Sequence, residues 1–111
     1  MQQSFFKKLE ELNEQRQLEW DTTQEGLGLL FKVVELCGEV GELANEIKKV
    51  HREQVGLVGS RSSMQAAEDE FGDLIICTAL LAKELGIDIE QATINKFNNT
   101  SAKHNFKTVW E

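Results

Sequence analysis

The feature that most constrains this chain is a stripe of apolar residues in the segment from about Leu27 to Arg52. The stripe recurs every three or four residues, the spacing that places side chains on one face of an α-helix. Its members are Leu29, Val33, Leu36, Val40, Leu43, Ile47 and Val50. The sequence therefore predicts a long amphipathic helix here, whose apolar face must be buried against other helices.

Three further helices are predicted from similar spacing and from capping residues. They cover about Ser4–Trp20, Ser62–Leu85 and Ile89–Asn98, and a polar break over Asp21–Gly26 separates the first two of the four helices. Ser62 and Gln65 form a capping-box pattern, and Gly86 is the expected end of the third helix. We expect an all-α fold, a four-helix bundle-like protomer forming one domain over residues 1–111, with an extended tail from about residue 101.

The composition disfavours several classes of partner. The formal net charge is -7, and an acidic surface repels nucleic-acid phosphates, so we expect no nucleic-acid partner. No apolar run approaches the ~18–20 residues that span a bilayer, and the N-terminal segment lacks a signal-peptide pattern. We therefore expect a cytoplasmic protein with no membrane partner. Cys37 and Cys77 fall within apolar helical patterns and are expected to be buried free thiols.

A row of like charges accompanies the apolar stripe of the second helix. Its members, each one residue before a member of the stripe, are Glu35, Glu39, Glu42 and Glu46. Carboxylates at this spacing share one side of a helix and repel each other. A solvated helix face is the simplest interpretation, and a ligand set for cations is the alternative.

The third predicted helix favours the cation alternative. Glu70 and Asp73 are three residues apart, and Asp73 immediately precedes the most hydrophobic run of the chain, LIICTALLA (residues 74–82). A carboxylate drawn toward a core needs a base, a proton or a metal ion, and the nearest lysine on that helix is Lys83. Two carboxylate pairs on neighbouring helices suit Mg²⁺, with Mn²⁺ as a substitute. The 2 histidines and 2 cysteines are too few for a zinc site.

The two carboxylate pairs lie in the segments EVGE (39–42) and EFGD (70–73), which are separated by 27 residues. This arrangement resembles the paired ExxE…ExxD motif of the MazG-like, all-α nucleoside triphosphate pyrophosphohydrolases. The segment IDIEQATINKFNNTSAKHNF (87–106) is similar to the basic and asparagine-bearing end of that family. The resemblance covers the chain from about Leu29 to Phe106.

The resemblance implies a reaction and an assembly. The reaction is the Mg²⁺-dependent hydrolysis of a (deoxy)nucleoside triphosphate between the α and β phosphates, giving monophosphate and pyrophosphate, in the housecleaning of nucleotide pools. The assembly is a homodimer, or a homotetramer built as a pair of dimers, whose helices together build each site. A short chain with a wide apolar stripe also has reason to bury its remaining face against a copy of itself.

The resemblance also assigns roles to particular residues. The catalytic and metal-binding carboxylates correspond to Glu39, Glu42, Glu70 and Asp73. Lys96 corresponds to a phosphate-contacting lysine, and Lys103 to the basic residue that closes the motif. Many members have an asparagine four residues after that lysine. This chain has Thr100 there, with Asn98 just before it as the candidate polar contact.

Several further residues have two interpretations each. Trp20 belongs either to a core or subunit interface or to a stacking platform for the substrate base. Arg52 borders the glycine-containing loop 53–61 and either reaches the triphosphate or serves as a helix-surface cation. Glu35 or Glu46 is a candidate for orienting the attacking water, although an exposed helix glutamate is the favoured interpretation of Glu46.

Two rival functions fit the same sequence. The first is a non-catalytic helical bundle that mediates protein contacts, in which the acidic rows are solvated faces. The second is a phosphatase or a dUTP-directed relative on the same scaffold. Turnover of nucleotides separates the first rival from an enzyme, and analysis of substrates and products separates the second.

Overall fold

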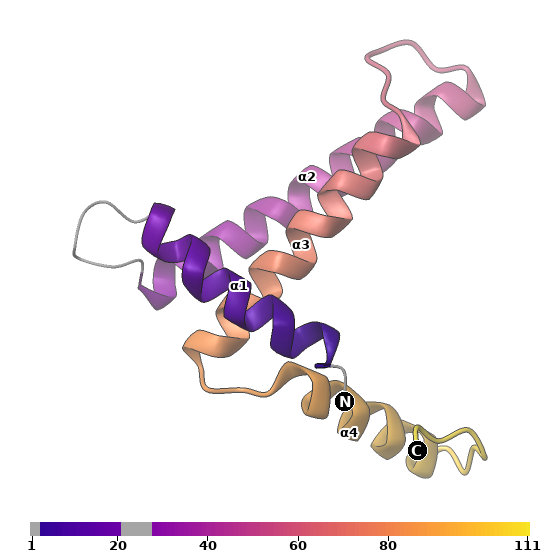
Figure 1. Cartoon of the computed structure of the whole chain (residues 1–111). Coiled ribbons are helices and arrows are strands. Elements are labelled where there is room, and N and C mark those ends of the chain that lie inside the picture. The colour runs from indigo at the N-terminus through magenta and orange to yellow at the C-terminus, as the bar shows by residue number, and fades with distance from the viewer. Residues whose placement is uncertain (1–2, 21–27) are drawn as a thin grey trace.

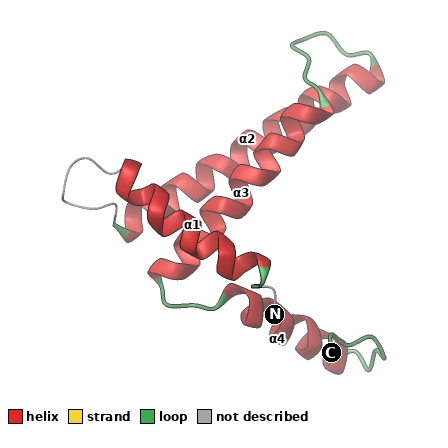
Figure 2. Cartoon of the chain, viewed as in Figure 1, coloured by secondary structure: helices red, strands yellow, loops and turns green. Residues whose placement is uncertain are grey.

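The computed structural model describes residues 3–20 and 28–111. These residues form four helices, and no strand occurs among them (Figures 1 and 2). The helices are α1 (Phe5–Trp20), α2 (Leu29–Val55), α3 (Met64–Glu84) and α4 (Ile89–Lys103). The prediction of an all-α fold is confirmed. The polar break over Asp21–Gly26 and the predicted start of the second helix at Leu27 lie outside the described residues.

The antiparallel pair of α2 and α3 forms the centre of the structure, and α1 crosses α3 (Figure 1). Burial follows this arrangement, because the hydrophobic residues with the least exposure come from the two paired helices. They are Leu43 of α2 and Ala67, Cys77, Leu80 and Ala82 of α3. Fully burying a leucine side chain stabilises a fold by roughly 1.5–3 kcal/mol, so this seam holds the two long helices together.

The ends of α3 are set by local hydrogen bonds. Ser63, one residue beyond the predicted Ser62, is the N-cap, and its hydroxyl accepts a hydrogen bond from the Ala66 backbone N–H at 3.2 Å. The prediction that the helix stops at Gly86 is confirmed. Gly86 has φ of 70°, and the N–H of the following Ile87 donates to the Ala82 carbonyl at 2.8 Å. This left-handed turn is accessible to glycine at little cost and ends the helix.

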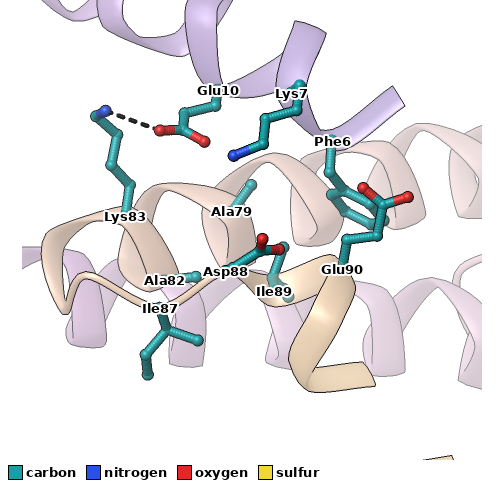
Figure 3. Close-up of a pocket in the computed structure, with 10 residues that line it drawn as sticks. All are labelled: Phe6, Lys7, Glu10, Ala79, Ala82, Lys83, Ile87, Asp88, Ile89 and Glu90. Carbon is teal, nitrogen blue, oxygen red and sulfur yellow. Dashed lines mark hydrogen bonds and ion pairs between the residues drawn. The ribbon is translucent and has the colours of Figure 1, made fainter. Parts of the chain in front are cut away.

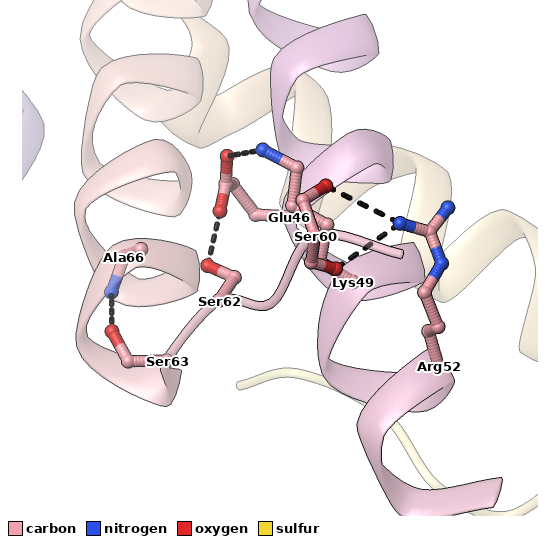
Figure 4. A network of polar contacts seen from close by, with 7 residues as sticks. All are labelled: Glu46, Lys49, Arg52, Ser60, Ser62, Ser63 and Ala66. Carbon is pink, nitrogen blue, oxygen red and sulfur yellow. Dashed lines mark hydrogen bonds and ion pairs between the residues drawn. The ribbon is translucent and has the colours of Figure 1, made fainter. Parts of the chain in front are cut away.

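The loop between α2 and α3 is fastened to α2 by side chains (Figure 4). Glu46 accepts a hydrogen bond from the Ser62 hydroxyl and forms an ion pair with Lys49 at 3.3 Å. Arg52 Nη1 donates to the Ser60 carbonyl at 3.1 Å and to the Ser60 hydroxyl at 3.3 Å. The interpretation of Glu46 as an exposed helix glutamate is therefore wrong, because it is half-buried and bonded to the loop. The hydrogen bond from Ser62 lowers the pKa of Glu46 below its usual 4.5.

Helix α4 is longer than predicted and extends away from the α2–α3 pair (Figure 1). It begins at the N-cap Asp88 and continues to Lys103, beyond the expected end near Asn98. The tail folds back on it instead of running free. The Asn98 side chain donates to the Trp110 carbonyl at 3.0 Å and accepts from the Trp110 backbone N–H at 2.7 Å. The protomer is consequently more open than a closed four-helix bundle.

A small cavity of about 20 Å³ lies where α1, the end of α3 and the start of α4 meet (Figure 3). That volume holds about one water molecule. Beside it Lys83 of α3 contacts two carboxylates of α1, Glu10 at 3.1 Å and Glu14 at 2.6 Å. These ion pairs fix where α1 crosses α3. They also explain why Lys83 does not serve Asp73, since its ammonium is directed toward α1 (Figure 3).

Much of the α2 apolar surface is left uncovered by the described chain. Leu43 of the predicted stripe is buried, whereas Val40 and Ile47 are half exposed. Leu30, which follows the first residue of the stripe, is 76% exposed. A Cβ added to Gly38 or Gly41 would meet nothing within 4 Å among the described atoms. The described part of this chain therefore places no close neighbour against these two helical glycines.

The two cysteines of the chain differ in exposure. Cys77 is buried, as predicted, but Cys37 is exposed on α2, so that prediction is wrong for Cys37. The helix places Cys37 on the side of α2 that the described chain does not cover. None of the described helices combines the length and apolarity needed to cross a bilayer.

The contact between Ser62 and Glu46 predicts a pH-dependent stability. Ser62→Ala should destabilise the protein near pH 7, because the half-buried Glu46 carboxylate loses a donor. A carboxylate with a lowered pKa stabilises the folded state above its unfolded pKa, and that stability is lost on acidification. The loss of unfolding free energy caused by Ser62→Ala should therefore become smaller as the pH falls below 4.5. Urea denaturation at a series of pH values measures this loss.

Two neighbouring serines provide controls. Ser63→Ala should cost about 1 kcal/mol by removing the α3 N-cap, with no dependence on Glu46. Ser60→Ala should have a smaller effect, because Arg52 keeps its bond to the Ser60 backbone carbonyl. Equal, pH-independent losses in Ser62→Ala and Ser63→Ala would show that Ser62 does not act through Glu46.

Candidate metal centre and adjoining pocket

The antiparallel register of α2 and α3 brings the two predicted carboxylate pairs face to face. Because the helices run in opposite directions with the same rise, Glu42 lies level with Glu70 when Glu39 lies level with Asp73. The spacing of three residues in each pair keeps both members on the contact side of their helix. The structure thereby combines four acids from two distant parts of the sequence.

Three of these acids form a tight cluster. Carboxylate oxygens of Glu39, Glu70 and Asp73 all lie within 4.8 Å of one another. Glu39 and Glu70 are half-buried, and Asp73 is exposed. One oxygen of Glu39 and one of Glu70 are buried with no hydrogen-bond partner. Buried oxygens without donors are costly, so this geometry calls for a cation or a proton.

The electrostatics of the cluster reflect this crowding. Burial, followed by the charge of Glu42 and a hydrogen bond with it, raises the pKa of Glu70 from 4.5 to about 7. Burial, followed by the charges of Glu42 and Asp73, raises the pKa of Glu39. Glu42 is exposed and borders the cluster, since its charge acts on both residues. Hard oxygen donors of this kind fit a divalent cation such as Mg²⁺ or Mn²⁺.

A pocket of about 270 Å³ opens beside the cluster, between α1 and the α2–α3 pair. Glu39 and Asp73 line it on one side, and Trp20 lines it from α1. The predicted aromatic residue and the predicted carboxylates therefore share one hollow. Trp20 is 72% exposed, so it is a pocket residue in this structure and not a core residue.

Glu35 and Cys77 also line this pocket and contact each other. The Cys77 thiol donates to a Glu35 oxygen at 3.7 Å. Burial, followed by the charge of Glu35, raises the pKa of the Cys77 thiol to about 12. The thiol therefore stays protonated near neutral pH and holds Glu35 as a donor.

The remaining predicted residues lie elsewhere in the described chain. Arg52 is 13 residues along α2 from Glu39, roughly 20 Å at the helical rise, and is bonded to the loop. Lys96, Asn98 and Lys103 lie on α4, which extends away from the α2–α3 pair (Figure 1). Within a single chain, Trp20 therefore lies beside the carboxylates, whereas Arg52 and the α4 residues lie apart from them.

Two pocket residues were not selected from the sequence. Arg16 and Gln17 line the pocket together with Trp20. The sequence contained a signal for both residues, because they lie four and three residues before Trp20 and therefore on the same face of the helix. The crossing of α1 over α3, which turns that face toward the carboxylates, could not be predicted from the sequence.

Comparisons with known proteins agree with this geometry. A family model described as "MazG nucleotide pyrophosphohydrolase domain" matches residues 30–105. The chain is also similar to the "Gene 37 protein" of Mycobacterium phage L5, with 32% identity over 78 residues. That match covers 68% of this chain and 66% of the phage protein, so the chain spans just under two thirds of this relative's length.

The crowding of carboxylates around Glu70 predicts that its carboxyl group titrates at a higher pH than usual. Without divalent cations, the Glu70 carboxyl should titrate near pH 7 instead of 4.5, measured by carbon NMR of the labelled side chain. Because its pKa is raised, its contribution to stability is full below pH 4.5 and is lost as the pH rises through 7. Glu42→Gln should lower the midpoint, since it removes the charged neighbour. A Glu70 midpoint near 4.5 in the wild type would contradict the crowding.

Proposed function

Because this chain belongs to the MazG nucleotide pyrophosphohydrolase family, we propose that it hydrolyses nucleoside triphosphates between the α and β phosphates. The products are a nucleoside monophosphate and pyrophosphate, and the role is the removal of surplus or non-canonical nucleotides. The observation that carries the proposal is the cluster of Glu39, Glu70 and Asp73, in which one buried oxygen of Glu39 and one of Glu70 lack partners.

The carboxylates fit divalent cations by their chemistry. We assign the ligands as Glu39, Glu42, Glu70 and Asp73, with Mg²⁺ as the cation and Mn²⁺ as a substitute. When bound, such cations neutralise the negative charge that builds on the phosphates during hydrolysis. The raised pKa values of Glu39 and Glu70 reflect burial and neighbouring negative charges, which a bound cation would offset.

The attacking water needs a base or a positioning group, and Glu35 is the better placed candidate. Its carboxylate lines the pocket beside Glu39 and Asp73. Glu46, the other candidate, is bonded to Ser62 and Lys49 at the loop. The hydrogen bond from the Cys77 thiol orients Glu35 and leaves its other oxygen for a water.

The pocket provides a place for the nucleoside. Trp20 offers an aromatic face on which a base stacks, and its pocket is continuous with the carboxylates. Arg16 is the cationic residue among those that line this pocket. A substrate bound there has its base near α1 and its phosphates near the cluster.

A second copy of the chain completes the proposed site. Lys96 and Lys103 suit contacts with phosphate, but α4 carries them away from the carboxylates of its own chain (Figure 1). The uncovered apolar surface of α2, including Leu30 and Val34, suits a homodimer or homotetramer. In that assembly the partner's α4 supplies the basic residues, while Asn98 holds the tail through Trp110.

Two measurements test the proposed reaction. The first is product analysis of the wild type, and the second is the activity of a variant in which Asp73 has lost its charge. The wild type, incubated with a panel of canonical and modified dNTPs and Mg²⁺, should release monophosphate and pyrophosphate instead of orthophosphate. Asp73→Asn should reduce kcat by at least about 100-fold, because a ligand of the phosphate-neutralising site is lost. Helicity measured by circular dichroism should be unchanged.

Glu68→Gln is the matched control on α3. Glu68 is exposed and lies outside the cluster, so the variant should keep wild-type activity. Full activity in Asp73→Asn would refute the site assignment. Absence of turnover by the wild type, across all nucleotides and divalent ions tried, would favour the non-catalytic bundle.

The shared site is tested by mixing two inactive variants. Asp73→Asn lacks a carboxylate and Lys96→Ala lacks the proposed phosphate contact, so each should be inactive alone. Random pairing in a dimer restores about a quarter of the sites, because each mixed dimer has one intact site. Activity of the unfolded and refolded mixture measures this, and a mixture no more active than its two components would place both residues in one chain's site.

A further inference from the structure

The middle of α1 contains a buried amide with an unsatisfied donor. Asn13 is only 3% exposed, and its Nδ2 has no hydrogen-bond partner. It is the one buried residue of α1, on the side where that helix crosses α3. Its neighbours around the adjoining hollow include the apolar Leu9, Leu12 and Ile76.

Such a group weakens the fold that contains it. Burying an amide donor without a partner costs the desolvation free energy of that donor. A leucine at this position has the same branched arrangement of heavy atoms and would extend the apolar contact between α1 and α3 without an unpaired donor. A buried unsatisfied polar group calls for a specific reason, and a ligand that supplies the missing acceptor is one.

The position of Asn13 indicates which ligand. It lines a hollow of about 340 Å³ that shares Arg16 and Ile76 with the pocket of Trp20 and the carboxylates. Asn13 and Trp20 are seven residues apart, about 10 Å or two turns along the same helix face. A nucleotide anchored by its phosphates at the carboxylates, with its base against Trp20 and extending past Arg16, would direct the far edge of that base toward Asn13.

We propose that Asn13 is a specificity-determining residue that binds the hydrogen-bonding edge of the nucleobase. This inference rests on the proposed function. An asparagine amide presents a donor and an acceptor side by side, which matches the adjacent acceptor and donor on the edge of a base. The unpaired atom is the Nδ2 donor, which a ring nitrogen or carbonyl oxygen of a base can accept, and with the phosphates held at the carboxylates the base is the part of the nucleotide left to reach it.

Access to the amide requires a small rearrangement at the surface. Arg16 is exposed, lies on the next turn of α1 and lines both hollows. Its long side chain is the element free to move aside when a base enters. The buried amide is then paired only when a suitable base is bound, and a base with a mismatched edge leaves it unpaired. This difference provides discrimination between bases.

The test replaces the amide with an apolar side chain of similar size. Asn13→Leu should keep or raise the melting temperature, because the unpaired buried donor is removed. The ratio of kcat/KM between the best and the worst substrates in a dNTP panel should fall by about 10-fold or more, through loss for the preferred base. Asn45→Ala, an exposed asparagine on α2, is the control and should change neither quantity.

A binding measurement makes the test independent of turnover. In calorimetry, Asn13→Leu should bind the preferred nucleoside monophosphate at least about 10-fold more weakly than the wild type, while pyrophosphate with Mg²⁺ binds equally to both. An unchanged selectivity ratio in folded Asn13→Leu would overturn the proposal. Loss of folding in both Asn13→Leu and Asn13→Ala would also overturn it, because the amide would then be structural.

Failure of this inference is distinguishable from failure of the proposed function. A wild type that turns over no nucleotide refutes the proposed function itself. A wild type that is active and selective, with an equally selective Asn13→Leu variant, refutes only the role of Asn13. A wild type that is active without any base preference likewise refutes only the role of Asn13.

Discussion

The antiparallel contact between α2 and α3 is the constraint on which the site depends. Apolar residues on both sides of the contact, among them Leu43, Cys77 and Leu80, hold the two helices together. The same register sets carboxylates of α2 opposite carboxylates of α3. Hydrophobic burial therefore forces like charges together that would separate in a freely moving chain, and the strain appears as the raised pKa of Glu70.

The other two helices add different functions to this pair. α1 crosses α3 and lines a pocket beside the carboxylates with Trp20 and Arg16, where we propose that the part of a substrate that is not phosphate binds. α4, which contains Lys96 and Lys103, extends away from the pair (Figure 1). The proposed metal-binding carboxylates thus lie on the α2–α3 pair of one protomer. The proposed phosphate contacts lie on α4 and would reach the carboxylates of a second protomer.

The sequence predicts what local spacing determines. Helix spans follow from periodicity within one segment, the pairing of EVGE with EFGD is indicated by the family resemblance, and the stop at Gly86 follows from backbone chemistry. Features that depend on a neighbour were missed. Ser62 and Ser63 look equivalent in sequence, and only the proximity of Glu46 draws Ser62 away from the cap. The exposure of Cys37 and the pocket role of Arg16 likewise depend on where other helices lie.

The acidic row of α2 shows how tertiary contacts give four similar side chains different environments. Glu35 at one end accepts a hydrogen bond from the Cys77 thiol, and Glu46 at the other end is neutralised by Lys49 and Ser62. Glu39 and Glu42 in the middle face acids on α3, so the charges around them are the like charges of Glu70 and Asp73. The repulsion within the row is thus relieved at its ends by the protein itself. In the middle it is relieved only by a bound cation or proton, which is why the centre of the row is the place to expect chemistry.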